Sequence, residues 1–218
     1  MWSYDKKNEG GREGNDLLEL RLKTDSFVVE SDIHFPTDLW LLWDSIRKSL
    51  DMIGLINKEE YLPTWRKLKD WQKKLKKLYR AASNIHRKKG ANYKVRLQTA
   101  TKLYLEAIDK MVVRIAETLV KLERIGGIIV EALCVELKKY YKYVLKFRDQ
   151  VDRRILKGEV IPQEEKIFSI FEEHVEWLSK GKIGKPVELG HKVLITTDQY
   201  HFIVDHKVLI KQSDKAVR

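Results

Sequence analysis

The sequence has a single cysteine, Cys134, among its 218 residues. One cysteine can form neither an intrachain disulfide nor a cysteine-rich zinc site. Its apolar neighbours Val130, Leu133 and Leu137 favour a small buried side chain at this position. Several catalytic signatures are also missing: a Cys-x-x-Cys pair, a His-Glu-x-x-His helix, a glycine-rich phosphate loop and a Gly-x-Ser-x-Gly turn. Zinc hydrolysis, nucleotide hydrolysis and serine catalysis therefore have no support.

Long apolar runs are missing as well. No segment approaches the ~18 apolar residues of a membrane span, and no apolar signal-peptide region stands near the N-terminus. We therefore expect a cytoplasmic protein with no membrane partner. Residues 1–16 are rich in Gly, Lys and Glu, and we predict that they form a disordered lead.

Acidic residues are scarce relative to basic ones. The chain has 43 Lys and Arg against 32 Asp and Glu, which gives a formal net charge of +11. Such an excess suits a polyanionic partner, with nucleic acid the first candidate and an anionic membrane surface the second. A basic protein without such a partner is the alternative. Hydrophobic residues make up 43% of the chain, enough for a packed core.

Most of this excess lies in one segment. Between residues 66 and 89 a single acid, Asp70, accompanies eleven basic residues: Arg66, Lys67, Lys69, Lys73, Lys74, Lys76, Lys77, Arg80, Arg87, Lys88 and Lys89. A solvated helix face usually mixes charges of both signs, whereas an unmixed face repels itself unless a polyanion neutralises it. We therefore predict that this segment contacts DNA or RNA. Lys182 and Lys185, in a basic loop, are further candidates.

The hydrophobic period changes from two to 3.6 and back along the chain. Alternation predicts a strand over 17–30, and spacings of three and four then predict a helix that Thr37 or Asp38 caps. After a break at 54–58, we predict helices over 59–89, 91–124 and 128–157, and two strands over 187–196 and 200–210. The heptad seam of the third helix fits a bundle core better than a dimer zipper. Its residues are Leu105, Ile108, Val112, Ile115, Leu119 and Leu122.

Two separated motifs resemble DDE transposases of prokaryotic insertion sequences. The first runs from Asp25 to Asp38 as DSFVVESDIHFPTD, and LLWDSIR follows it from Leu41; the family pattern reads like DTTVVExxIHYPTD and then LLxDxxR. The second, PVELGHKV from Pro186, is similar to the family's PVEFGHKV strand. Between the two motifs, the helices match only in general character.

The resemblance implies an α+β fold, a partial ribonuclease-H-like antiparallel sheet interrupted by a large helical block. It divides the chain into a first catalytic-core strand and motif turn (17–36), a basic inserted helical bundle (37–157), a linker and basic loop (158–186) and a core β-hairpin (187–218). The implied activity is DNA cleavage and strand transfer by Mg²⁺ or Mn²⁺ held on three carboxylates. Asp25 matches the first carboxylate. The supporting motif residues are Glu30, His34, Pro36, Thr37, Asp38, Gly190, His191 and Lys192.

The family's second Asp and its Glu have no match, so the chain resembles a C-terminally truncated form. Asp198, Asp205 and Asp214 are weaker candidates for the second ligand. Asp25 alone is a weak metal site, and we expect no stable Mg²⁺ or Mn²⁺ binding. For Asp38, helix capping is favoured over metal ligation, and for His34, a structural or DNA-backbone role is favoured over a general base.

Two functions stay open. The chain is either part of a transposase, acting on insertion-sequence ends and target DNA, or a non-catalytic regulatory protein that kept only DNA binding. A homodimer and the remainder of a split transposase are the protein partners that the resemblance allows.

Overall fold

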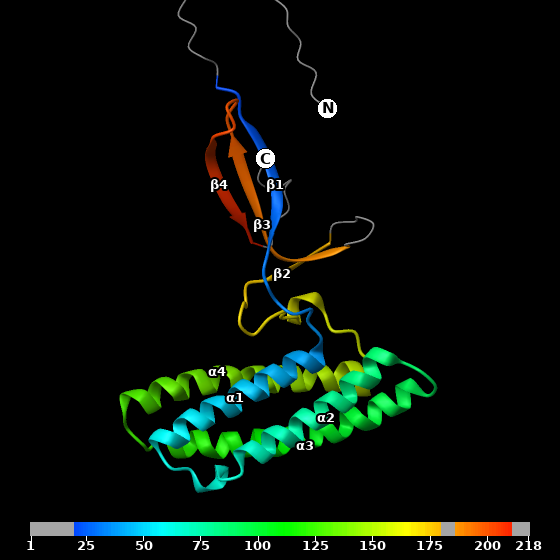
Figure 1. Cartoon of the computed structure of the whole chain (residues 1–218), viewed down its shortest axis with the longest axis vertical. Helices are drawn as coiled ribbons and strands as arrows, with labels where there is room; N and C mark the ends of the chain where they lie inside the picture. Colours follow the sequence, from blue (N-terminus) through cyan, green and yellow to red (C-terminus); the bar gives the residue numbers. More distant parts are fainter. Residues whose placement is uncertain (1–19, 180–185, 211–218) are drawn as a thin grey trace, which may run out of the picture. The chain divides into compact units, whose positions relative to one another are not determined.

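The structure has the α+β architecture that the change of hydrophobic period along the sequence predicts. The computed structural model describes residues 20–179 and 186–210 and contains four α-helices and a four-stranded antiparallel sheet (Figure 1). The chain forms two compact units. One comprises residues up to Glu30 and from Gly190 onward, and the other comprises Ser31–Leu189. The predicted disordered lead over 1–16 lies outside the described residues.

The alternating segment forms strand β1 (Lys23–Glu30), and the two predicted C-terminal strands form β3 (Val187–Thr197) and β4 (Ile203–Leu209). β3 pairs antiparallel with both β1 and β4, so the strand that carries Asp25 does pair with the hairpin. Residues 20–22, part of the predicted strand, lie outside β1, and 17–19 are not described. A short strand, β2 (Glu176–Ser179), completes the sheet beside β3.

The pairing of β1 with β3 depends on a glycine. Gly190 lies opposite Glu30, and a Cβ atom at this position would come within 2.1 Å of the Val29 carbonyl oxygen and 2.9 Å of the Glu30 Cα. Those distances are shorter than any ordinary carbon contact, so the two backbones could not approach as they do with any other residue there. The glycine of the second motif thus has a structural reason.

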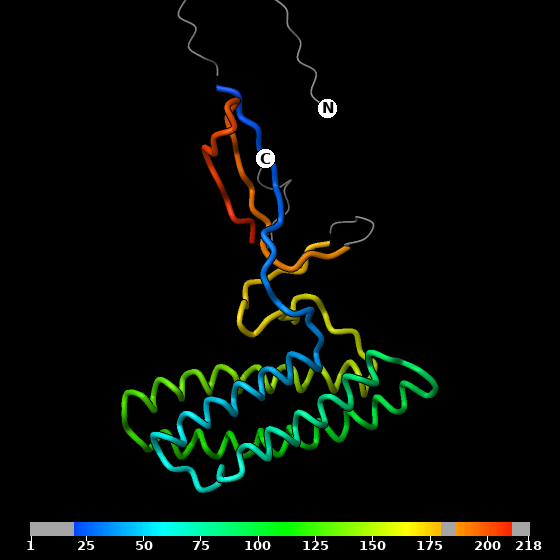
Figure 2. The backbone as a smooth tube through the Cα atoms, viewed as in Figure 1, coloured from blue at the N-terminus to red at the C-terminus, as the bar shows by residue number. Residues whose placement is uncertain are grey.

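The four helices form a bundle in which consecutive helices run in opposite directions and pack against each other. α1 (Asp38–Glu59) contacts α2 (Leu68–Lys88) and α4 (Ile128–Val151), and α3 (Tyr93–Leu122) also contacts α2 and α4. The tube in Figure 2 alternates in direction from α1 to α4, joined by short turns. The predicted seam of α3 lies in the bundle core: Val112 is half-buried against it and the other seam residues are buried.

The expected break at 54–58 is wrong, as is a helix that begins at residue 59. α1 continues through Gly54, where Leu68 Cδ2 lies so close that a Cβ atom would be 3.2 Å away. The chain turns after Glu59, where the Asn57 side chain accepts a hydrogen bond from the Leu62 amide (2.7 Å). A short 3₁₀ turn over Pro63–Trp65 then precedes α2. Proline is tolerated in the first turn of a helix, where the amide hydrogen that it lacks would have no intrahelical acceptor.

Two buried threonines of α3 differ in their hydrogen bonds. The indole nitrogen of Trp65, a residue only 1% exposed, donates to Thr118 Oγ1 at 2.8 Å. Thr118 Oγ1 in turn donates to the Arg114 carbonyl at 2.8 Å. Thr101 Oγ1 is also buried but has no partner among the described residues. One hydroxyl therefore stabilises the bundle, and the other only carries a desolvation cost.

This contrast yields a paired prediction. Thr118→Val leaves the Trp65 N–H buried without an acceptor, and should lower the free energy of unfolding by about 1–3 kcal/mol. Thr101→Val removes an unsatisfied hydroxyl of the same shape, and should leave the stability unchanged or raise it. Urea denaturation followed by helical circular dichroism measures both. Equal losses in the two variants would contradict the assigned hydrogen bond.

The close approach at Gly190 yields a second prediction. Gly190→Ala forces the β1 and β3 backbones apart, at a cost of about 1–3 kcal/mol for overpacking. The amides of β1 should exchange with solvent about tenfold to hundredfold faster by hydrogen-exchange mass spectrometry. Gly126→Ala is the matched control, since a Cβ at Gly126 meets no atom within 4 Å. Unchanged β1 protection in Gly190→Ala would refute the contact.

Candidate nucleic-acid interface

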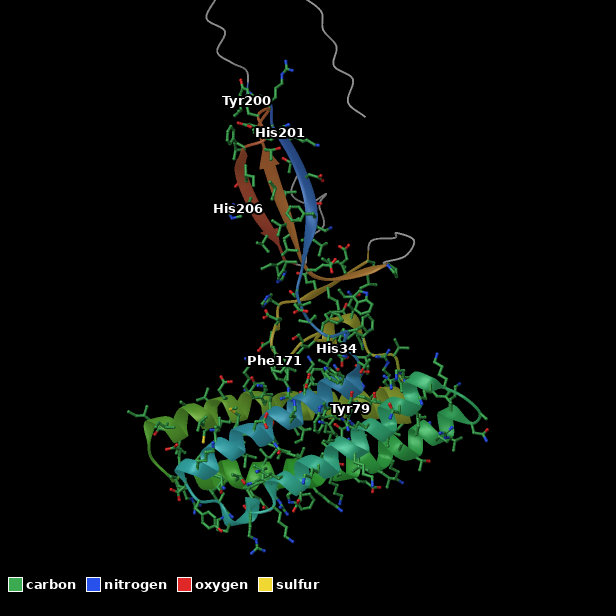
Figure 3. The ribbon with its side chains drawn as sticks, viewed as in Figure 1. His34, Tyr79, Phe171, Tyr200, His201 and His206 are labelled. Atoms are coloured by element: carbon green, nitrogen blue, oxygen red, sulfur yellow. The ribbon has the colours of Figure 1, made fainter. Side chains whose placement is uncertain are left out.

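Helix α2 separates an apolar face from a basic one. Leu75, Tyr79 and Ala82 are buried against the bundle, and the rings of Tyr79 and Trp43 stack with centroids 5.6 Å apart. Figure 3 shows Tyr79 within the bundle. All eleven basic residues between 66 and 89 are exposed. The apolar face fixes the helix in the bundle and leaves the charged face toward solvent.

The eleven cations lack carboxylate partners. Among the residues that the structure describes, none of them forms an ion pair; Arg87 donates instead to Asn84 (2.9 Å), and the Lys74 ammonium lies 5.6 Å from the Trp71 ring centre. Some cations elsewhere in the bundle do have carboxylate partners. Arg148 forms a two-pronged pair with Asp109, and Arg153 contacts Asp149, Glu159 and Glu165. The segment of α2 and the turn before it differs from the rest of the bundle in its ratio of charges, eleven cations to the single acid Asp70.

The last turn of α2 carries a histidine that does not add to this charge. Burial, followed by the nearby cations Arg154 and Lys89, holds the pKa of His86 below its usual range. A lowered pKa means that the imidazole is neutral at pH 7, so the positive charge of the helix end comes from Arg87, Lys88 and Lys89 alone.

Lys182 and Lys185, the basic-loop candidates, lie outside the described residues. Nothing in the structure therefore bears on the second predicted contact with nucleic acid.

Asp25 lies on an exposed face of the sheet, within β1. Its Oδ1 accepts a hydrogen bond from the Ser26 amide at 2.8 Å. The cross-strand partner of Asp25 is Ile195 on β3, and Ile195 in turn pairs with His206 on β4 (Figure 3). Because alternate residues share a face, Phe27, Val193 and Val208 form the next row on the same side.

The two weaker acid candidates that the structure describes, Asp198 and Asp205, do not join Asp25. Asp205 pairs with Thr196, one residue out of step with the row of Asp25, so its side chain lies on the opposite face. Asp198 has a local role: its Oδ1 accepts from the amides of Tyr200 and Phe202, each at 2.9 Å, and shapes the β3–β4 loop. Asp214 is outside the described residues.

The donor set around Asp25 does not fit the metal site that the resemblance implies. Mg²⁺ prefers oxygen ligands and takes one or two carboxylates together with water and phosphate. The described residues of this face offer one carboxylate, the imidazoles of His191 and His206, the Lys23 ammonium and mostly apolar side chains. No cluster of three or more His, Cys, Asp or Glu side chains able to hold a metal occurs within 20–179 and 186–210.

The motif turn is a helix start. Thr37 Oγ1 accepts from the Trp40 amide at 3.2 Å and caps α1. The alternative prediction, that Asp38 is the cap, is wrong, because Asp38 is the first residue of α1. Its carboxylate accepts a hydrogen bond from Arg154 at 2.8 Å. The negative charge also interacts favourably with the positive N-terminal end of the helix dipole. The His34 ring lies 4.6 Å from that of Trp40, and Pro36 joins the two. These residues position the entry to α1.

The second motif lies beside the end of β1. Glu30, Val29 and Val28 pair in register with Gly190, His191 and Lys192, respectively. The two motifs, separated by more than 150 residues in the sequence, are thus brought together by strand pairing. Sequence reasoning placed them in one sheet through the resemblance and could not derive this register.

Sequence reasoning missed a cavity of about 880 Å³ in the helical unit. Its aromatic wall is made by Phe35, Phe168 and Trp177 and its basic rim includes Lys94 and Lys166. The aromatic residues between 166 and 177 are the available signal in the sequence, and by themselves they indicate only a short buried segment of strand or helical turn. The residues of the cavity come from five separate stretches of the chain, a convergence that no single pattern reveals.

The α-helices in the described part of the chain are all too short or too polar to cross a membrane. Comparisons of the chain with protein-family models, with curated proteins and with solved structures found no match.

Proposed function

We propose that this chain binds duplex DNA through the exposed face of α2, as a protein of the DDE transposase type. The observation that carries the proposal is the set of eleven exposed cations without a carboxylate partner. DNA supplies the charge that this face lacks. Each Lys or Arg that meets a phosphate releases condensed counterions, and this release drives association.

The arrangement of the cations along α2 supports a backbone contact. Lys69, Lys73, Lys76, Arg80 and Arg87 recur at intervals of four, three, four and seven residues, so they follow one side of the helix. At 1.5 Å per residue this stripe is about 27 Å long. A duplex of that length carries roughly sixteen phosphate charges, more than the stripe needs. Phosphate contacts position a protein without reading sequence, so the binding should have little sequence preference.

The transposase class rests on the resemblance and on the sheet. β1, β3 and β4 follow one another in antiparallel order, and the helices are inserted between the first two. A partial ribonuclease-H-like sheet is our proposal for this arrangement, with Asp25 as the first catalytic carboxylate. The complete activity would be metal-dependent strand cleavage and transfer at insertion-sequence ends, in the nucleoid. A homodimer and a second polypeptide with the other carboxylates are partners that this proposal allows.

The surroundings of Asp25 favour a second candidate. Ile195 lies beside Asp25, His206 follows beyond Ile195 in the same row, and Asp205 lies on the other face of the sheet. A chain with this arrangement could retain DNA binding and act as a non-catalytic regulator that competes for element ends. Both candidates require the α2 interface and differ only in the role of Asp25.

The salt dependence of binding tests the α2 interface. If about five of the eleven cations contact phosphates, the log–log slope of affinity against salt should be about −4 to −5 on duplex DNA. Changing Lys73, Lys74, Lys76 and Lys77 together to Glu should flatten this slope by several units. These four side chains are exposed, so the helical circular dichroism should be nearly unchanged. Fluorescence anisotropy at several salt concentrations measures the slope.

A matched variant separates local contact from net charge. Changing Lys102, Lys110, Lys121 and Lys142 to Glu alters the net charge equally at exposed positions of α3 and α4. This control should reduce the affinity less and preserve most of the slope. Equal slopes in both variants would move the interface away from α2, and the absence of binding at low salt would refute the proposed function.

Plasmid nicking tests the role of Asp25. We expect the purified chain to bind supercoiled plasmid without nicking it in Mg²⁺ or Mn²⁺, because Asp25 is the sole carboxylate matched to the family's three. Agarose electrophoresis of the relaxed product is the readout. Nicking that disappears in Asp25→Asn but persists in Asp198→Asn would overturn this expectation, and would favour the catalytic candidate over the regulatory one.

A further inference from the structure

The cavity of about 880 Å³ lies within the helical unit and is large enough for a nucleotide-sized ligand. Its walls come from the segment before α1, the last turn of α2, the first turns of α3, the end of α4 and the chain around β2. The site is separate from Asp25, which belongs to the other unit.

One wall of the cavity is aromatic. The rings of Phe35 and Trp177 meet edge to face with centroids 5.5 Å apart, and the rings of Phe168 and Trp177 are 5.6 Å apart. Trp177 and Phe168 are half-buried, and Phe35 is 60% exposed. Partly exposed rings gathered at a cavity provide flat apolar surfaces on which a base can stack.

The rim of the cavity is basic. Lys94 and Lys166 line it and neither forms an ion pair with a described residue. Arg154 also lines it; its guanidinium pairs with Asp38 at 2.8 Å and its side chain is still 55% exposed. Cations beside aromatic surfaces are the combination that binds single-stranded nucleic acid, where phosphates meet the cations and bases stack on the rings.

The cavity adjoins the end of α2. His86, in the last turn of that helix, lines the cavity, and Arg87, Lys88 and Lys89 follow it. A duplex that lies along the basic stripe of α2 and terminates at its last turn would therefore have its end near the cavity. An end with unpaired nucleotides could then place them inside.

We propose that this cavity receives unpaired nucleotides at the end of a DNA strand, with a base stacked on Trp177 and phosphates held by Lys94 and Lys166. The proposal rests on the proposed function for the duplex part of the ligand. The stacking itself depends only on the cavity, so the two can fail separately.

The test compares four fluorescent DNAs in anisotropy titrations of the full chain: a blunt duplex, the same duplex with a four-nucleotide 5′ overhang, the same duplex with a four-nucleotide 3′ overhang, and a single-stranded octamer. We expect one of the overhang duplexes to bind about tenfold tighter than the blunt duplex, a typical gain from stacking one base on an aromatic ring. We also expect the octamer to bind.

Variants assign the gain to the cavity. Trp177→Ala should remove the tenfold preference and weaken octamer binding by a similar factor, while blunt-duplex binding stays unchanged; Trp177→Phe should keep most of the preference. Tyr61→Ala, at an exposed aromatic residue away from the cavity, is the matched control and should have no effect. The exposed rim is tested independently of the ring by Lys94→Glu, which should weaken binding of the overhang duplex more than that of the blunt duplex.

The outcomes separate the two proposals. Equal binding of blunt and overhang duplexes by the native chain overturns the cavity proposal and leaves the proposed function standing. Octamer binding that depends on Trp177, without any duplex binding, supports the cavity and refutes the α2 interface. A preference that survives both Trp177→Ala and Lys94→Glu places the unpaired nucleotides elsewhere and overturns the inference, even if Trp177→Ala alone perturbs the fold.

Discussion

Repulsion among the unpaired cations of α2 is the constraint on which the helical unit depends. Like charges on one helix face oppose helix formation, and α2 offers almost no acidic residue to offset them. Burial of Leu75, Tyr79 and Ala82 on the other face holds the helix in place, and Tyr79 adds ring contacts with Trp43 and Tyr104. Packing in the bundle thus keeps the cations of α2 close together, and a bound polyanion would reduce the repulsion among them.

Local patterns in the sequence were sufficient for β1, β3 and β4 and for most of the bundle, but not for the short strand β2. The alternation of apolar and polar residues that predicts β1 matches the two-residue repeat of side chains along a strand. The seam residues of α3 are buried or half-buried, as their heptad spacing predicts. Thr37 is a helix cap because a hydroxyl at that position reaches the amide three residues later. In each case the signal is a periodicity or a residue type within a short stretch, although β1 and the α3 seam are completed by contacts with distant elements.

Features that depend on distant contacts could not be predicted in this way. α1 continues through Gly54, against which Leu68 packs closely, and no local signal in the sequence reports that contact. The environment of Asp25 depends on which residues of β3 and β4 pair beside it. If β4 shifted by one residue against β3, Asp205 would replace His206 on the face of the sheet that carries Asp25. The cavity needs side chains from several elements at once. Sequence reasoning found the candidate residues of β1 and α2 but not their neighbours.

The division into two units explains why the two candidate functions are hard to separate by sequence. The α2 cations and the cavity belong to the helical unit, whose core is its own, whereas Asp25 belongs to the sheet unit. DNA binding by the first unit therefore requires no carboxylate of the second. A chain can lose strand-transfer chemistry through changes around Asp25 without disturbing the packing that orients α2, so a transposase and a regulator derived from one would share the same binding surface. The residues that would distinguish them are the neighbours of Asp25 on the sheet, not the more numerous α2 cations for which we propose DNA contacts.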